Sequence, residues 1–499
     1  MIEKTIKGIK YRLDEENLTA EVILKKGYEG DIIIPEVVVF RKISYRVTTI
    51  GERAFSFCSS LTSIVIPDSV TSIGERAFYN CSSLTSMVIP DGVTSIGSGA
   101  FWACPSLTSI VIPVGVTSIE ESAFKGCSSL TSIVIPESVT SIGRWAFDGC
   151  SSLTSMVVAE RNTVYDSREQ CNAIIHTATN TLISGCQSTI IPDSVTSIGY
   201  CAFSGCSSLT SIVIPDSVTS IEESAFSFCE SLTSIVIPDG VTSIGEDAFS
   251  WCSSLTSIVI PDSVTSIGES AFWNCSSLTS IVIPDSVTRI GDYAFSGCSS
   301  LTSIIIGNRV TRIEQAVFEG CSSLTSVVIP DSVTSIEDAA FAGCSSLTTI
   351  VIPDSVISIE DSAFEGCKSL NEQSIVKEVV INQLCFRLLL HNQLAMVAGY
   401  SGDPETIDIP SEINMDGIIY RVTSLGDNAL ADCSSLTSVV IPESVTYIGF
   451  LVFVDSYSLT SFTFQGTIAQ WKQVDIHESN WDEGFPFTVV HCTDGDVKI

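Results

Sequence analysis

Cysteine and histidine are the residues of this chain that could support chemistry, through disulfide bonds, metal binding or nucleophilic catalysis. The 499 residues include 19 cysteines and 4 histidines. No two cysteines have the C-x-x-C spacing of a zinc site, and most occupy one position of a 23-residue unit. These cysteines are Cys58, Cys81, Cys104, Cys127, Cys150, Cys206, Cys229, Cys252, Cys275, Cys298, Cys321, Cys344, Cys367 and Cys433. A shared position points all these side chains the same way, so we predict a ladder of buried free thiols.

Five cysteines lie outside this series, and two of them lie near each other in the sequence. The five are Cys171, Cys186, Cys201, Cys385 and Cys492. Cys171 and Cys186 flank a predicted hairpin and could form a disulfide bridge there. Their redox state stays open at this point.

The histidines offer little support for catalysis. They are His176, His391, His477 and His491. His491 beside Cys492 could suggest a catalytic pair, and Asp494 with Asp496 a calcium loop. Catalytic pairs are usually separated in sequence, however, and an EF-hand loop needs other spacings and a terminal glutamate. We interpret this segment as a structural tail and predict no enzymatic activity, no metal and no cofactor.

The 23-residue unit itself predicts one coil of a solenoid. In residues 61–81, Ser63–Ile66 alternates as a short strand, Pro67 ends it, and Gly74 permits a second bend before Ala77 and Phe78. The predicted inward set is Leu61, Ile64, Ile66, Val70, Ile73, Ala77, Phe78 and Cys81. Ordering 23 residues costs about 35 kcal/mol, which this core cannot offset alone. A unit therefore folds only when it stacks on its neighbours.

The pattern L-x-x-L-x-I-P-x-x-V-x-x-I-G-x-x-A-F-x-x-C resembles the BspA-type leucine-rich repeat family, also called the Treponema pallidum class. It covers most of residues 50–370 and returns at 425–459; Gly307 replaces the proline once and Leu430 the phenylalanine once. We predict a leucine-rich repeat solenoid, a β-rich right-handed coil of 23-residue rungs with short strands and short helical or 3₁₀ turns. The resemblance implies a non-enzymatic protein, often on a bacterial or protozoan surface, that binds extracellular-matrix proteins or other cells.

Two segments match each other at a constant offset of 375 and read as caps, which solenoids need at open ends. The predicted parts are an N-terminal cap (1–57), a main array (58–375) with a hairpin insertion at about 159–187 that protrudes from its edge, a second cap-like module (376–432), a short second array (433–462) and a C-terminal cap (463–499). Trp471, Trp481, Phe485 and Phe487 are available to cover the last rung in that C-terminal cap.

Charge and hydropathy restrict the partners. The formal net charge is −33, with 24 Lys and Arg against 57 Asp and Glu, so we expect no nucleic-acid partner. An acidic surface of this kind also keeps a long rod soluble. No run of eighteen apolar residues occurs, so we expect no membrane insertion. The first thirty residues match the internal cap and leave no room for a signal peptide, which would make the protein cytoplasmic if Met1 is its natural start.

Two surfaces are candidates for binding a protein partner. One is a ladder of outward strand positions that includes Val213, Val236, Val259 and Val282. It could be a partner site, or the side chains could cover one another and simply favour the strand. The other consists of residues that vary near the Ala-Phe turn, which could be interface anchors or half-buried packing. They are Phe57, Tyr79, Trp102, Trp145, Phe228, Trp251, Trp273 and Tyr293, with Arg53, Arg76, Lys125 and Arg144 nearby.

The leading hypothesis is a non-enzymatic protein-interaction solenoid, adhesin-like or host-interacting, with an extracellular-matrix or cell-surface protein as partner. Its location by family resemblance is the cell surface or the medium. An intracellular structural scaffold or spacer is the alternative, and a carbohydrate-binding module is a third.

Overall fold

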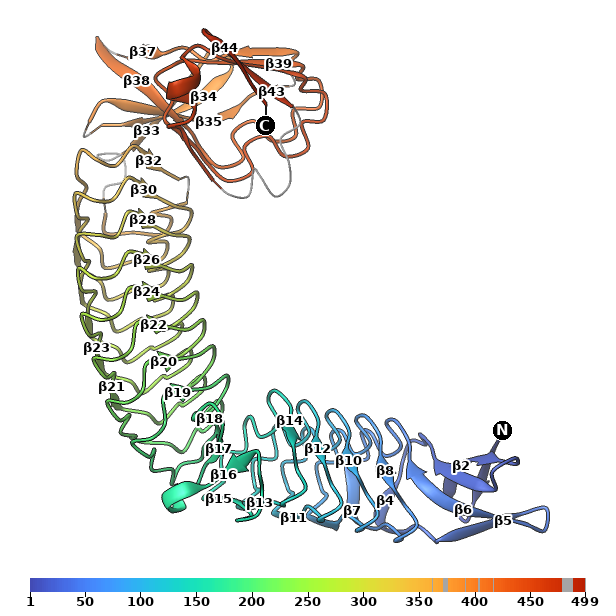
Figure 1. Ribbon diagram of the computed structural model, residues 1–499. Helices are drawn as coiled ribbons and strands as arrows, with labels where there is room; N and C mark the ends of the chain where they lie inside the picture. Colours follow the sequence, from blue (N-terminus) through green and yellow to red (C-terminus); the bar gives the residue numbers. More distant parts are fainter. Residues whose placement is uncertain are drawn as a thin grey trace. The chain divides into compact units, whose positions relative to one another are not determined.

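The computed structural model describes residues 1–360, 362–370, 376–390, 392–402, 404–415, 417–477 and 488–498. It is a β-solenoid, and Figure 1 shows the stacked coils in each part of the chain. Equivalent residues of neighbouring coils pair at an interval of 23 residues, as Ser63 does with Ser86 and Ser86 with Ser109. The chain forms two compact units, Met1–Thr279 and Ser280–Ile499. The predicted leucine-rich repeat solenoid is confirmed.

The first unit begins with a small sheet that continues into the rungs. Its strands are β1 (Ile2–Ile6), β2 (Ile9–Asp14), β3 (Thr19–Val22), β5 (Val37–Phe40), β6 (Ile43–Ile50), β8 (Ser72–Ile73), β10 (Ser95–Ile96), β12 (Ser118–Ile119) and β14 (Ser141–Ile142). The opposite side of each coil carries the longer repeat strands. These are β4 (Glu29–Ile33), β7 (Ser60–Val65), β9 (Ser86–Val88), β11 (Ser109–Val111), β13 (Ser132–Ile135), β15 (Ser155–Val158), β21 (Ser234–Val236) and β23 (Ser257–Val259).

The hairpin of the insertion is built into the stack and does not protrude from it. The insertion contains β16 (Tyr165–Asp166), a 3₁₀ helix η1 (Arg168–Gln170), β17 (Ile174–His176) and β18 (Thr181–Ser184). The predicted hairpin of β17 and β18 is present, but β18 also pairs in parallel with the next rung strand, β19 (Ser197–Ile198). The sheet then runs through β20 (Ser220–Ile221), β22 (Ser243–Ile244) and β24 (Ser266–Ile267). Protrusion was therefore wrong, because the buried side chains of Ile174 and Leu182 require a place in the core.

The second unit repeats this plan in two stages. Its rungs contain β25 (Ser280–Val282), β26 (Arg289–Ile290), β27 (Ser303–Ile305), β28 (Arg312–Ile313), β29 (Ser326–Val328), β30 (Ser335–Ile336), β31 (Thr349–Val351) and β32 (Ser358–Ile359). The module that follows contains β33 (Val376–Ile381), β34 (Leu384–Leu389), β35 (Leu394–Tyr400), β36 (Thr406–Asp408), β37 (Glu412–Met415) and β38 (Ile418–Leu425). The last part contains β39 (Ser438–Ile441), β40 (Tyr447–Ile448), β41 (Ser461–Phe464), α1 (Ile468–Trp471), β42 (Asp475–Ile476), β43 (Val489–Cys492) and β44 (Gly495–Lys498).

The internal similarity at offset 375 corresponds to two modules with the same topology. In both, two antiparallel hairpin pairings lead to a parallel pairing with a register shift, β3 with β6 and β35 with β38. A short antiparallel strand flanks each last strand, β5 and β37. Of the residues predicted to cover the last rung, Trp471 is buried, while Trp481, Phe485 and Phe487 lie outside the described residues. His391, in the second cap-like module, also lies outside them.

Each rung corner is held by its neighbour. Alternate N–H groups bond within the corner and to the next rung: Ala77 N–H donates to the Gly74 carbonyl at 3.3 Å, and Phe78 N–H to the Ala100 carbonyl at 2.8 Å. The bonds within the corner are those of the expected 3₁₀ turn. The remaining N–H groups bond to the next corner and not within the same one, so no continuous 3₁₀ helix forms. The corner is instead a series of tight turns in which Ala77 and Phe78 are buried.

Phenylalanine rings and thiols fill the space behind the corners. Successive rings stack nearly parallel, as between Phe55 and Phe78, with centroids 5.2 Å apart. The Cys81 thiol donates to the Phe55 carbonyl at 3.1 Å, and this bond recurs along the array. All 19 cysteines are free, and Cys171 and Cys186 donate to backbone carbonyls without a bridge between them.

We predict that the folded protein hides nearly all its thiols. Burial raises the pKa of Cys252 and Cys206 to about 12 and that of Cys201 to about 11, so the reactive thiolate is scarce near neutral pH. Titration with Ellman's reagent at pH 8 should detect about two thiols at most, since only Cys385 and Cys492 are partly exposed. The same titration in guanidinium chloride is the control and should detect all 19. Rapid labelling of many thiols in the folded protein would contradict the ladder.

Candidate functional site

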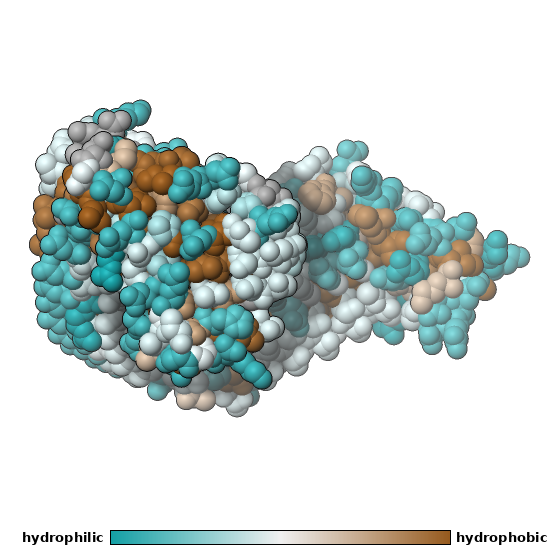
Figure 2. Space-filling model, turned by 90° about the horizontal axis from the view of Figure 1, so that it is seen from above, coloured by the Kyte–Doolittle hydropathy of each residue, from teal (hydrophilic) through white to brown (hydrophobic). Residues whose placement is uncertain are grey.

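The corners of the first rungs form a groove lined by aromatic and basic side chains. These corners come directly after β6, β8 and β10 in the sequence. The variable residues of each corner point outward because its Ala and Phe occupy the inward positions. The groove has a volume of about 690 Å³ and is lined by Leu24, Lys26, Arg53, Ser56, Phe57, Arg76, Tyr79 and Trp102. Hydrophobic residues form broken patches among hydrophilic ones over the N-terminal part of the chain, which is found to the right in Figures 1 and 2.

The aromatic rings of this groove contact one another in sequence. The Phe57 and Tyr79 rings meet edge to face with centroids 5.0 Å apart, and Tyr79 and Trp102 lie at the same distance. The Arg76 guanidinium lies 5.7 Å above the Trp102 ring. Phe57 is 65% exposed, while Tyr79 and Trp102 are half-buried. The rungs therefore bring Phe57, Tyr79 and Trp102 together, as sequence reasoning grouped them.

Phe57 occupies a backbone position that suits glycine. Its φ is 59°, which lies in the left-handed region of backbone conformation. Glycine adopts this region most easily, and asparagine more easily than other residues. The equivalent residues of later rungs in this unit include Gly126, Gly149 and Gly205, also with positive φ. Asn80, Ala103 and Asn274 have a positive φ at the same position, so this conformation belongs to the fold of the corner. What distinguishes Phe57 is an exposed aromatic ring at a corner that most other rungs occupy with small or polar residues.

The basic and aromatic residues continue along the following corners. The Lys125 amino group lies 5.5 Å from the centre of the Trp145 ring, and the Arg144 guanidinium lies 4.5 Å from that of Tyr200. Trp145 and Tyr200 contact each other at 5.3 Å. Sequence reasoning named Trp145 but missed Tyr200. The signal for Tyr200 was that it occupies the same position in its rung as Arg144 does in the preceding regular rung.

A second aromatic cluster lies further along the first unit. Phe228 and Trp251 stack at 5.8 Å, and Trp251 meets Trp273 at 5.6 Å. Phe228 and Trp251 share the positive φ of Phe57. Tyr293 belongs to the second unit, where it also has a positive φ and is half-buried.

The valine ladder is exposed, as expected for outward strand positions. Val213 is 83% exposed, Val236 72% and Val259 71% in the first unit; Val282 is 55% exposed in the second. Neighbouring valines therefore do not cover one another fully. This surface is nevertheless a row of small side chains that alternates with serines, and its binding role stays a prediction.

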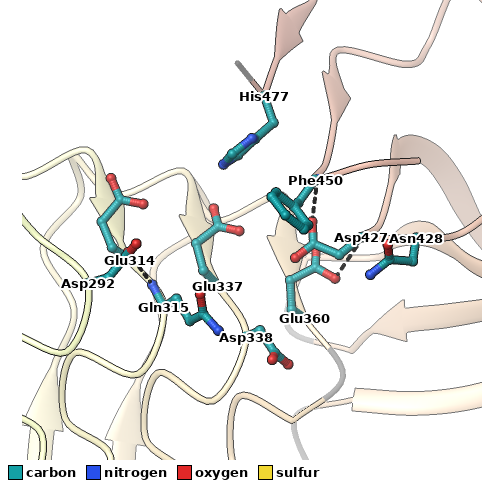
Figure 3. A pocket seen from close by; sticks show the side chains of 10 residues that line it. All are labelled: Asp292, Glu314, Gln315, Glu337, Asp338, Glu360, Asp427, Asn428, Phe450 and His477. Carbon is teal, nitrogen blue, oxygen red and sulfur yellow. Dashed lines mark hydrogen bonds between the residues drawn. The ribbon is translucent and has the colours of Figure 1, made fainter. Parts of the chain in front are cut away.

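The second unit contains an acidic pocket that sequence reasoning missed. It has a volume of about 290 Å³, and Figure 3 shows the side chains that line it. Glu314, Glu337 and Glu360 project from three successive rungs, at the position that is glycine in most other rungs. This replacement of Ile-Gly by Ile-Glu in three consecutive units was the sequence signal for the pocket.

Three carboxylates of this pocket are close enough to share a cation or a proton. Oxygens of Glu337, Glu360 and Asp427 lie within 4.8 Å of one another. Glu337 accepts hydrogen bonds from Ser335 and Tyr447, and Glu360 accepts one at 3.0 Å from the Asp427 N–H. An all-oxygen donor set of this kind suits a hard cation such as calcium.

Burial and mutual repulsion make these carboxyl groups unusually basic. Burial and then the Glu337 charge raise the pKa of both Glu314 and Asp427 to about 7. Burial also raises the pKa of Glu337, and that of Glu360 well above its ordinary value. Basic groups nearby, Arg312 and Arg387, oppose these shifts without cancelling them.

The acidic residues near His491 make local contacts. The His491 imidazole contacts the Asp496 carboxylate at 2.9 Å across the β43–β44 hairpin, and Asp494 accepts the Ile468 N–H at the start of α1. Both acidic groups therefore have local partners. Among the described residues, no helix is long and apolar enough to cross a membrane.

The chain belongs to the BspA-type leucine-rich repeat family. The model of the BspA type leucine-rich repeat region matches residues 42–171, 183–302, 265–391 and 411–477. A leucine-rich repeat protein of Bacteroides ovatus is 29% identical, with 95% of this chain and 98% of that one covered and a TM-score of 0.47. No curated protein sequence matches the chain.

Two further solved structures resemble it. A leucine-rich cell surface protein of Faecalibacterium prausnitzii is 30% identical, with 74% of this chain and 94% of that one covered and a TM-score of 0.39. The pneumococcal vaccine antigen PcpA is 20% identical, with 72% and 94% covered and a TM-score of 0.51. The family is one of protein-interaction repeats on a non-enzymatic scaffold fold.

We predict that the acidic pocket makes the second unit less stable as pH rises. A pKa raised in the folded state means that the folded chain holds protons that the unfolded chain releases above pH about 4. The stabilisation is therefore complete below pH about 4 and is lost as pH rises through about 7, the pKa of Glu314 and Asp427. Glu360→Gln removes one buried charge and should raise the thermal midpoint by roughly 2–4 °C at pH 8, with little effect at pH 5.

Calorimetry of the full chain at pH 5 and pH 8 checks this expectation. Glu365→Gln is the matched control, because it removes an exposed carboxylate from the following corner of the same rung. An equal shift for both variants, or one for Glu360→Gln that is independent of pH, would show that overall charge and not the pocket sets the pH dependence.

Proposed function

We propose that this protein is an adhesin-like or host-interacting solenoid that binds a protein of the extracellular matrix or of another cell through the aromatic corners of its first unit. The observation that carries the proposal is the basic and aromatic groove, in which Phe57 presents an exposed ring. Aromatic residues and arginine are the commonest anchors of protein interfaces.

Family membership supports a protein partner, and one similar protein supports the cell surface. The Faecalibacterium prausnitzii protein is described as a cell surface protein, and PcpA as a vaccine antigen. Rigid rungs favour binding because the corner side chains are already in place, so little conformational entropy is lost.

An intracellular scaffold or spacer is the second candidate. It is favoured by the ladder of free thiols, because cytosolic proteins keep cysteines reduced. Carbohydrate binding is a third candidate, supported by the exposed rings of the second aromatic cluster, Phe228, Trp251 and Trp273. Burial of the thiols weakens the argument for the cytosol, since a buried thiol is protected in either compartment.

We expect the full chain to bind at least one immobilised matrix protein from a panel of fibronectin, laminin and collagen. A Phe57→Gly/Trp102→Ala variant should bind at least 30-fold more weakly, the effect of losing a hot-spot residue of about 2 kcal/mol. Phe57→Gly introduces the residue that later rungs use at this position, so stability should change by less than about 1 kcal/mol. Surface plasmon resonance gives the affinities, and thermal unfolding checks the fold.

Val236→Thr is the control, because it alters the exposed valine ladder without touching the groove. If Val236→Thr weakened binding and the groove variant did not, the partner would bind the valine ladder. Protease shaving of intact producing cells separates the first two candidates: cleavage from outside supports the adhesin-like role, and protection supports the scaffold.

A further inference from the structure

We propose that the groove of Arg53, Phe57, Arg76, Tyr79 and Trp102 binds an acidic segment of its protein partner, a stretch in which carboxylates alternate with apolar side chains. This inference rests on the proposed function and names the chemistry of the partner. It is carried by charge complementarity, by the arginine geometry and by a matched second cluster that lacks the arginines.

The charge of the groove is opposite to that of the chain. Acidic residues outnumber basic ones by 57 to 24 overall. The lining of the groove nevertheless contains three cations, Lys26, Arg53 and Arg76, and no carboxylate. Four of the remaining lining residues are apolar or aromatic. A ligand that suits this surface combines negative charge with apolar groups.

The two arginines keep donors for a ligand. Arg53 lies 3.8 Å from the carboxylate of Glu52, and Arg76 lies 3.4 Å from that of Glu75. Both pairs join sequence neighbours, and their side chains are between about a third and two thirds exposed. Exposed pairs of this length contribute about 0–1 kcal/mol, so a carboxylate with better geometry can replace them. A guanidinium binds a carboxylate through two parallel hydrogen bonds, which favours aspartate or glutamate as the group recognised.

The groove suits a short extended segment. From the corner of Arg53 to that of Trp102 the groove crosses two rung spacings of about 4.8 Å, or roughly 10 Å. An extended chain advances about 3.3 Å per residue, so about three residues fit along this length. Alternate side chains of an extended segment face the groove, which matches a pattern of acidic residues separated by apolar ones.

The second aromatic cluster provides an internal comparison. Phe228 and Trp251 have the same rung position and backbone conformation as Phe57. The residues equivalent to Arg53 and Arg76 are Ser224 and Asp247 in that cluster. The chain therefore presents aromatic corners twice, once with cations and once without, and only the first should select an acidic ligand.

A sulfated polysaccharide is the competing anion. It would need a row of cations and gain little from apolar groups, whereas Leu24, Phe57, Tyr79 and Trp102 line the groove with apolar surface. The neighbouring Glu52 and Glu75 also weaken a purely electrostatic site. The groove therefore favours a peptide over a polysaccharide.

Fluorescence polarisation with the full chain tests the proposal. The probe is a labelled octapeptide that alternates glutamate and leucine, compared with the same peptide carrying glutamine in place of glutamate. We expect the glutamate peptide to bind at least tenfold more tightly, with affinity that falls as NaCl increases from 50 to 300 mM. Arg53→Gln/Arg76→Gln should remove at least tenfold of this affinity, and Trp251→Ala should leave it unchanged. Both arginines are exposed enough for the double variant to fold, which thermal unfolding confirms.

Equal affinity for the two peptides, or an unchanged affinity in the double arginine variant, would overturn the proposal. So would binding of heparin, but not of the glutamate peptide, that depends on the same arginines. A matrix protein that binds through Phe57 and Trp102 while the acidic peptide does not would leave the proposed function standing and reject only the acidic segment. Binding of the acidic peptide without binding of any matrix protein would support the acidic specificity of the groove and reject the proposed matrix-protein partner.

Discussion

The structure depends on hydrogen bonds that each rung makes to the next one. At the corners, half of the N–H groups have their acceptor on the following rung, as between Phe78 and Ala100. The thiols of most repeat cysteines, such as Cys81, donate to a phenylalanine carbonyl of the preceding rung. A single unit would leave these groups unpaired, which costs free energy for every buried donor. The same bond survives where the cysteine is replaced: the Ser456 hydroxyl donates to the Leu430 carbonyl at 2.8 Å. The donor, and not sulfur chemistry, is what this position requires.

This constraint decides where the protein can carry variable residues. Leucine, isoleucine, phenylalanine and cysteine positions are committed to the core, and the proline turn closes one side of the coil through the bond from Val70 N–H to the Pro67 carbonyl. The outward corner positions, the strand valines and the glycine position are free to differ. Phe57, Arg76 and Trp102 use the corner positions in the first unit, and Glu337 and Glu360 use the glycine position in the second. The two units thus carry opposite chemistry on one framework.

The acidic pocket shows the consequence of stacking identical positions. A residue that recurs every 23 places lies beside its equivalents, so a glutamate in consecutive rungs meets other glutamates. Asp427 from the second module completes the group, and burial then raises the pKa of its carboxyls. In the groove of the first unit the same stacking brings aromatic rings together at 5.0 Å, which stabilises them.

The sequence by itself determined the repeat, the register of its strands, the inward residues, the ladder of repeat cysteines and the duplication of the cap, because a strict 23-residue period leaves one way to pair equivalent positions. It also grouped Phe57, Tyr79 and Trp102 as candidates. It could not give the left-handed conformation of Phe57, which follows from bonds between rungs, nor the incorporation of β17 and β18 into the stack. Only the tertiary structure placed Asp427 beside Glu337 and Glu360, since the module of β33 to β38 interrupts the repeat between Glu360 and Asp427.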